Sequence, residues 1–249
     1  MDDTQHERYS RQMILRGIGH AGQERINRAR VLVLGLGGLG SPVTLYLAAA
    51  GVGTLVLVDF DNVELSNLQR QILHRSADVG RPKTESAADA VRALNPDVKV
   101  IALNQFLQGA ELRREVAAAD LVIDASDNFE TRYAVNQLCV QERKPLVSGA
   151  AIRMEGQVVV FRTDHDGPCY RCLYRDENGE SADTCSLTGV LGPVVGVIGS
   201  LQAAEALKLL AGIEQGLAGR LLLFDGLTAE WRSLKLRKDP ACPVCGATK

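Results

Sequence analysis

A continuous apolar run breaks into closely spaced glycines at residues 31–40, which read V-L-V-L-G-L-G-G-L-G. Gly35, Gly37 and Gly40 fit the pattern G-x-G-x-x-G, and the next segment, G-S-P-V-T-L-Y-L-A-A-A-G, is typical of a helix. Because glycine lets the backbone approach a phosphate and a helix N-terminus offers free N–H groups, this strand–turn–helix favours a nucleotide ligand. Asp59 ends the next apolar run, where a carboxylate can bind a ribose. The turn alone does not distinguish NAD from ATP.

Apolar and helical segments alternate through the first 150 residues or so of the chain. Further strands are expected in T-L-V-L-V-D-F-D, V-K-V-I-A-L, A-D-L-V-I-D-A-S-D-N and K-P-L-V-S-G-A-A. Continuous apolar strands separated by helices indicate a parallel sheet that is covered on both faces. The fold class is therefore α/β, with a doubly wound Rossmann-like nucleotide-binding sheet. From Gly156 onward, Q-V-V-V-F-R and R-L-L-L-F-D predict a C-terminal, partly antiparallel extension.

The charge balance and the chain's apolar segments exclude several classes of protein. Lys and Arg total 28 against 30 acidic residues, a net charge of -2 that favours neither nucleic acid nor an anionic membrane as partner. The N-terminus, M-D-D-T-Q-H-E-R-Y-S, is too polar for a signal peptide. Gln202, Glu205 and Lys208 interrupt the apolar segment 193–212, which we interpret as a buried helix and not a membrane span. We therefore expect a cytoplasmic protein with reduced cysteines.

Charged side chains after the second strand favour ATP over NAD. The segment D-F-D-N-V-E-L-S-N-L-Q-R-Q contains Asn67 and Arg70, and Lys83 follows in R-P-K-T. A triphosphate that releases pyrophosphate needs cations on its β and γ groups, whereas without such a ligand these residues would be a solvated loop and a surface lysine. Asp127, at the tip of the fourth strand, is suited to Mg²⁺, although it could also cap a helix expected near Glu130.

Two C-x-x-C knuckles account for four of the six cysteines. They are formed by Cys169, Cys172, Cys242 and Cys245. Four thiolates make a closed tetrahedral Zn²⁺ site, which would be structural. A redox dithiol is the alternative, but neither pair begins a helix of a βαβ unit. Cys139 lies in a helical segment and is expected in the core. We expect one domain over residues 1–249, with a nucleotide-binding half at 1–155 and a zinc-bearing half at 156–249.

Six longer phrases occur along the chain: R-Y-S-R-Q, G-L-G-G-L-G-S-P, G-V-G-T-L-V-L-V-D-F-D, L-S-N-L-Q-R-Q, S-D-N-F-E-T-R and S-G-A-A-I-R-M-E-G-Q. Together they resemble the MoeB/ThiF family, bacterial relatives of the ubiquitin-activating enzymes, in register from about Arg8 to Gly246. The resemblance implies an adenylyltransferase that uses ATP and Mg²⁺. Its substrate would be the C-terminal Gly-Gly carboxylate of a ubiquitin-like sulfur carrier, with release of pyrophosphate. Because that carboxylate is already ionised at neutral pH, no general base is required.

The resemblance also implies roles for individual residues. Asp59 would hold the ribose, and Asp127 would hold Mg²⁺. The catalytic set would be Arg11, Arg70, Lys83 and Asp127, with Arg11 reaching across a homodimer to the partner's ATP. On its own, Arg11 would be only a basic residue on an N-terminal arm. The full ATP-binding set would be Gly35, Gly37, Gly38, Gly40, Asp59, Asp61, Ser66, Asn67, Leu68, Gln69, Arg70, Lys83, Asp127 and Asn128.

The phrases point to two different carriers. S-G-A-A-I-R-M-E-G-Q resembles the branch that serves MoaD in molybdenum cofactor biosynthesis, which we favour. G-P-V-V-G-V-I-G-S-L-Q-A and L-F-D-G-L-T-A-E-W-R-S-L resemble the thiamine branch, whose carrier is ThiS, and one enzyme could serve both. The chain ends soon after Cys245 without a sulfurtransferase domain, so a separate sulfur donor is expected. Cys185, in the polar loop 175–187, matches a region where relatives carry a cysteine that can be linked to carrier or sulfur; an incidental loop thiol is the alternative.

Two other classes of function explain part of the sequence. An NAD-dependent oxidoreductase accounts for the glycine turn and Asp59 but leaves Arg70, Lys83 and Asp127 without a role. A zinc-ribbon nucleic-acid adaptor accounts for the cysteine knuckles, but the net charge argues against it.

Overall fold

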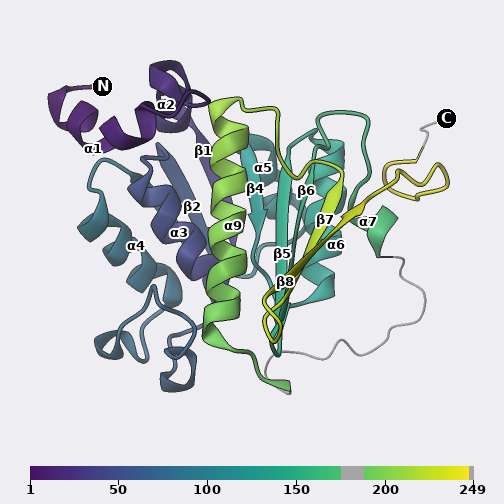
Figure 1. Ribbon diagram of the computed structural model, residues 1–249. Coiled ribbons are helices and arrows are strands. Elements are labelled where there is room, and N and C mark those ends of the chain that lie inside the picture. Colours follow the sequence, from purple (N-terminus) through teal and green to yellow (C-terminus); the bar gives the residue numbers. More distant parts are fainter. Residues whose placement is uncertain (175–187, 247–249) are drawn as a thin grey trace.

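The computed structural model describes residues 1–174 and 188–246, which build one eight-stranded sheet flanked by helices (Figure 1). The strand order is β3-β2-β1-β4-β5-β6-β7-β8. The strands are β1 (Arg30–Leu34), β2 (Thr54–Val58), β3 (Lys99–Leu103), β4 (Leu121–Asp124), β5 (Leu146–Ile152), β6 (Glu155–Phe161), β7 (Arg220–Asp225) and β8 (Glu230–Lys235). Pairing is parallel from β3 to β5 and antiparallel from β5 to β8. The predicted doubly wound sheet with its antiparallel extension is confirmed.

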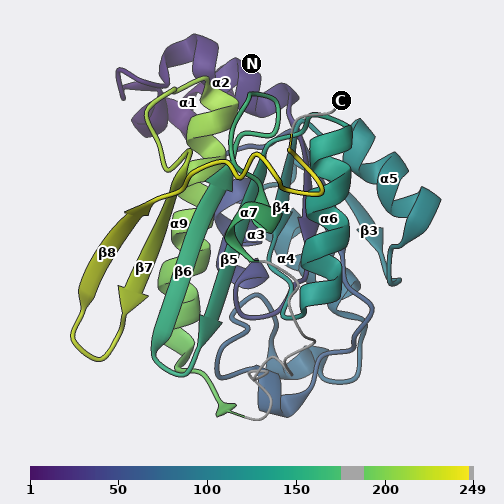
Figure 2. The same cartoon turned by 90° about the vertical axis from the view of Figure 1, so that its right-hand side faces the viewer.

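Helices cover both faces of the sheet, as continuous apolar strands require. They are α1 (Asp3–Met13), α2 (Gly19–Arg28), α3 (Gly40–Ala49), α4 (Lys83–Leu94), α5 (Gly109–Ala118), α6 (Phe129–Gln141), α7 (Tyr170–Leu173) and α9 (Gly192–Ala211), with 3₁₀ turns η1 (Leu65–Asn67) and η2 (Ser76–Asp78). Alternate residues of β1 enter two separate cores. Val31 and Val33 pack with α3, α4 and α9, whereas Leu32 and Leu34 pack with α5 and α6 (Figure 2).

The apolar helix α9 is a core element. By length and composition it is long and apolar enough to cross a membrane, but half of its most apolar stretch is buried inside the protein, where the helix packs against α3, β5 and β6. Its polar residues are held inside the protein: Gln202 Nε2 donates to the Asp124 carbonyl at 2.8 Å, and Glu205 accepts from the Leu217 amide at 3.0 Å. Two of the three predicted interruptions thus have internal partners, as expected of a helix that packs in the protein core.

The strand order places a crevice at the carboxyl ends of the parallel strands. The chain leaves β1 towards β2 on one side, whereas β4 pairs with β1 on the other, so the connections diverge at the carboxyl end of β1. Ligands of doubly wound sheets bind at such a point. The segment between β2 and α4 lies at this end of the sheet, at the bottom of Figure 1, and α1 and α2 lie at the opposite end.

Candidate functional site

A cavity of about 470 Å³ occupies the crevice, within the usual range for small-molecule sites. It extends from the glycine turn to the β5–β6 hairpin and the end of β7. Its charged side chains among the described residues are five carboxylates and four cations: Asp59, Asp61, Asp127, Glu155, Asp225, Arg70, Lys83, Arg132 and Arg232. The cavity alone therefore offers no excess of positive charge to a triphosphate.

The glycine turn has the tight geometry that its sequence predicts. Gly35 has a φ of 92° and donates its N–H to the Val58 carbonyl at 2.9 Å. A Cβ at Gly35 would lie 2.7 Å from the Ala125 carbonyl oxygen, and one at Gly40 would lie 1.9 Å from the Gly35 oxygen. Any larger residue at either position would force the turn open. The turn thereby presents Gly37 and Gly38 to the cavity.

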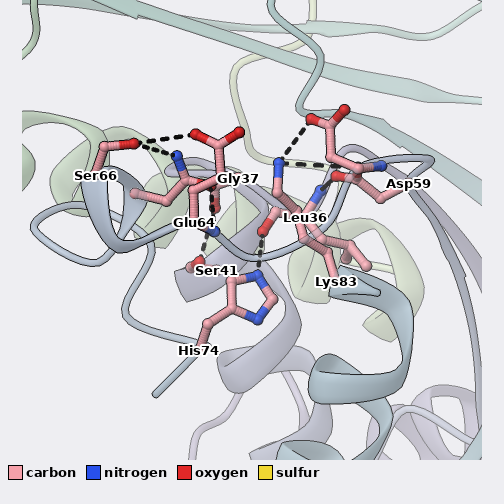
Figure 3. A network of polar contacts seen from close by, with 10 residues as sticks. Leu36, Gly37, Ser41, Asp59, Glu64, Ser66, His74 and Lys83 are labelled. Carbon is pink, nitrogen blue, oxygen red and sulfur yellow. Dashed lines mark hydrogen bonds and ion pairs between the residues drawn. The ribbon is translucent and has the colours of Figure 1, made fainter. Parts of the chain in front are cut away.

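Asp59 and Lys83 form a buried polar pair beside this turn (Figure 3). Asp59 Oδ2 accepts the Leu36 amide at 2.8 Å, and Oδ1 accepts the Asp61 amide at 2.9 Å. Lys83 is the first residue of α4 and only 5% exposed; its Nζ lies 2.8 Å from Asp61 Oδ2 and 3.9 Å from Asp59 Oδ1. A carboxylate oxygen has more than one lone pair, so Asp59 keeps acceptor capacity for ribose hydroxyls.

The phrase L-S-N-L-Q-R-Q divides into cavity residues and framework. Arg70 lines the cavity, and its Nη1 donates to the Ser66 carbonyl at 3.0 Å. Asn67 is buried, and its Oδ1 accepts the Glu64 amide at 3.3 Å, which closes the turn η1. Five members of the predicted ATP-binding set do not line the cavity in the described structure: Gly40, Ser66, Asn67, Leu68 and Gln69. Gly40 shapes the glycine turn, and contact with ATP by the other four stays a prediction.

Asp127 is exposed to the cavity and has no hydrogen-bond or ion-pair partner in residues 1–174 and 188–246. The helix cap is Asn128, whose Oδ1 accepts the Thr131 amide at 2.8 Å. The alternative in which Asp127 caps the helix is therefore wrong. A carboxylate that is exposed to the cavity and has no partner among these residues fits a Mg²⁺ ligand.

Sequence reasoning missed Arg132, which lines the cavity although its side chain is only 11% exposed. One Nη donates to the Ser126 carbonyl at 2.7 Å, and Nε lies 3.9 Å from Asp124 Oδ2. Burial alone would lower the pKa of Arg132, but the Asp124 carboxylate together with Tyr170 and Tyr174 outweighs burial and raises that pKa, so the guanidinium stays charged. Asp124 is itself held by the hydroxyls of Ser126 and Ser148. The available signal was Arg132 at the end of S-D-N-F-E-T-R, one helical turn after the cap.

The four predicted metal ligands converge. All four Sγ atoms lie within 4.8 Å of one another; Cys169 and Cys242 are 3.7 Å apart, and Cys172 and Cys245 are 3.3 Å apart. A tetrahedral zinc site with Zn–S bonds of ~2.3 Å separates its sulfurs by about 3.8 Å, so the cluster fits such an ion. Cys139 is fully buried and its pKa is raised by burial, as expected of a core thiol.

A sequence model described as the ThiF family matches residues 9–244. The chain belongs to the ThiF family. It is 51% identical to the molybdopterin-synthase adenylyltransferase of Escherichia coli over 99% of this chain and 98% of that protein. It is 50% identical to the ThiS adenylyltransferase of the same organism over 100% of this chain and 98% of that protein. The crystal structure of Escherichia coli MccB shares the fold, with a TM-score of 0.84 at 23% identity over 100% of this chain and 74% of that one.

Two residues singled out through the ThiF-family resemblance lie away from the crevice or outside the described residues. Arg11 is exposed on α1, which lies at the opposite end of the sheet from the cavity (Figure 1). It therefore cannot serve the cavity of its own chain, and action on a partner's ATP stays a prediction. Cys185 and the loop 175–187 lie outside the described residues.

Proposed function

We propose that this chain uses ATP to adenylate the C-terminal Gly-Gly carboxylate of a ubiquitin-like sulfur carrier and releases pyrophosphate. The observation that carries the proposal is the cavity that joins the glycine turn to Arg70, Lys83 and Asp127. An NAD-dependent dehydrogenase would need the turn and Asp59 only. The names of the ThiF-family relatives, which are adenylyltransferases of molybdopterin synthase and of ThiS, support the same reaction.

In the proposed reaction a carboxylate oxygen of the carrier attacks the α-phosphorus of ATP. The bond from that phosphorus to the bridging oxygen breaks, and pyrophosphate leaves with the electron pair. Arg70 and Lys83 would neutralise the charge that grows on the leaving group. Asp127 would hold Mg²⁺, which supplies further positive charge to the phosphates. Catalysis is then mostly alignment and charge neutralisation, and needs no side chain as general base.

The charge balance of the cavity supports a contribution from a second protomer. Carboxylates in the cavity offset its cations, so the triphosphate requires positive charge from elsewhere. Within the described residues, Arg11 is exposed and without an ion-pair partner. We propose that it enters the partner's site in a homodimer.

For the carrier we favour the MoaD type, with ThiS or service to both carriers as alternatives. S-G-A-A-I-R-M-E-G-Q, the phrase that resembles the MoaD branch, forms the β5–β6 hairpin. Ala150, Ile152 and Gln157 of this hairpin line the cavity, where the carrier's C-terminus would enter. We further propose that the Cys₄ cluster holds one structural Zn²⁺, that residues 1–249 act as one domain, and that sulfur comes from a separate donor.

Pyrophosphate release tests the proposal. The protein is mixed with ATP, Mg²⁺ and either MoaD or ThiS, and each carrier is matched by a variant that lacks its terminal Gly-Gly. We expect pyrophosphate with at least one intact carrier and none with its truncated form. Release that does not depend on the terminal glycines would contradict the proposed substrate.

A further inference from the structure

The Leu36 residue of the glycine turn is held by hydrogen bonds on both sides. Its N–H donates to Asp59 Oδ2 at 2.8 Å, and its carbonyl oxygen lies 3.0 Å from His74 Nε2 (Figure 3). His74 comes from the segment between η1 and η2, 38 residues further along the chain, and is only 6% exposed. A buried side chain from a distant segment therefore fixes the direction of this carbonyl.

The direction of the Leu36 carbonyl determines where the next amide points. In a planar trans peptide the C=O and the N–H of the same unit point in opposite directions. Because the Leu36 oxygen is directed at His74, the Gly37 N–H points away from it. Gly37 lines the cavity, and its N–H has no acceptor in the described part of the chain. The peptide thus offers a free donor to an anion.

The other ring nitrogen of His74 connects the turn to helix α4. A carbonyl only accepts, so Nε2 carries the proton that it donates to Leu36. Ser86 Oγ lies 2.9 Å from Nδ1, and its hydroxyl donates to Asp78 Oδ2 at 2.9 Å. Ser86 is buried in the first turn of α4, three residues after Lys83. One imidazole therefore joins the free Gly37 amide to the helix that carries the buried lysine.

We propose that His74 is a positioning residue. It fixes the orientation of the Leu36–Gly37 peptide, and its position relative to Lys83, so that both can bind the phosphates of the nucleotide. The proposal rests on the proposed function, since it requires ATP in this cavity. His74 is absent from the described residues that line the cavity, so it acts through the peptide and not by contact with the nucleotide.

The test is the dissociation constant of ATP with Mg²⁺, measured by calorimetry without carrier, together with a thermal melt of each protein. His74→Ala leaves the Leu36 carbonyl without its donor, and we expect ATP binding to weaken about tenfold. His74→Gln should restore binding to within about threefold, because the glutamine amide can donate from nearly the position of Nε2. Ser86→Ala keeps that donor but frees the ring, so we expect an intermediate loss.

Val52→Ala is the control for a loss of stability alone. Val52 is fully buried just before β2, at the end of the sheet away from the crevice. The Val52→Ala substitution should lower the melting temperature and leave ATP binding unchanged. Equal ATP affinity in His74→Ala and the unsubstituted protein would overturn the proposal, as would a loss in His74→Gln as large as in His74→Ala. If the unsubstituted protein does not bind ATP, the proposed function itself is wrong, and this role with it.

Discussion

Replacement of Lys83 by methionine separates the charge of that side chain from its packing. Methionine keeps most of the buried stem, so the change removes mainly the ammonium group. The pair with Asp61 contributes little to stability because that carboxylate is half-exposed. The contact with buried Asp59 at 3.9 Å is worth about 4 kcal/mol before desolvation, at an effective dielectric constant of about 20. Desolvation of the lysine cancels much of this, so we expect Lys83→Met to lower the free energy of unfolding by only about 1–2 kcal/mol.

The effect of Lys83→Met on ATP should be larger than its effect on folding. A charge-assisted hydrogen bond to a phosphate contributes about 1.5–3 kcal/mol, which predicts ATP binding weaker by about 10-fold to 150-fold. Calorimetry gives the dissociation constant, and urea denaturation gives the free energy of unfolding. Lys144→Met is the matched control, since Lys144 lies next to β5 at the end of the sheet away from the crevice and does not line the cavity. ATP affinity within twofold of the unsubstituted protein in Lys83→Met would refute the reasoning.

Three further results are expected. Arg70→Ala and Asp127→Ala should each lower carrier-dependent pyrophosphate exchange by at least about 100-fold and leave the melting temperature nearly unchanged, because within the described residues Asp127 is exposed and unpaired and Arg70 donates to a nearby carbonyl alone; near-normal exchange in either variant would remove that residue from the site. Metal removal by a chelator should release one zinc per chain and lower the melting temperature. The ATP dissociation constant should change less than threefold, because the Cys₄ cluster does not line the cavity. An unchanged melting temperature with a large loss of ATP affinity would argue against a structural metal. Burial of His74, with a smaller effect from Lys83, lowers its pKa below 6.5 against the opposing effects of the Leu36 carbonyl, Asp59 and Asp78. The unfolded chain therefore binds more protons, and stability should fall as the pH drops from 6.5 towards the folded pKa; His74→Gln should have a flatter urea-denaturation profile between pH 7.5 and 5.5, and an unchanged slope would contradict the assignment.

The parallel half of the fold follows from local sequence. The runs R-V-L-V-L and T-L-V-L-V are continuous and apolar because both faces of their strands are covered, and this pattern alone predicted the layers. Strand β8, E-W-R-S-L-K, had no such signal. All of its residues are exposed, and among the described strands it pairs with β7 alone, at the edge of the sheet. An edge strand with no buried face carries no hydrophobic period for the sequence to reveal.

In the candidate site, too, some features follow from local sequence and others do not. The tight glycine turn at Gly35 and Gly40 and the convergence of the four cysteines were predictable because they depend on nearby backbone geometry or on fixed short spacing. His74 and Arg132 were not, since their contacts join segments that are distant in the chain or stabilise a turn from within a helix. The proposed role of Arg11 requires a second protomer, so neither the sequence pattern alone nor the fold of one chain determines it.

The most direct test of the adenylation reaction is ATP–pyrophosphate exchange with Mg²⁺, with purified MoaD and ThiS offered separately. The exchange detects reversible formation of the acyl-adenylate and requires no later sulfur step. We predict exchange with at least one carrier, none without a carrier, and a loss of at least about 100-fold in Arg70→Ala. Exchange with one carrier identifies the branch, and exchange with both identifies a shared enzyme. ATP binding without exchange for either carrier would contradict the proposed substrate.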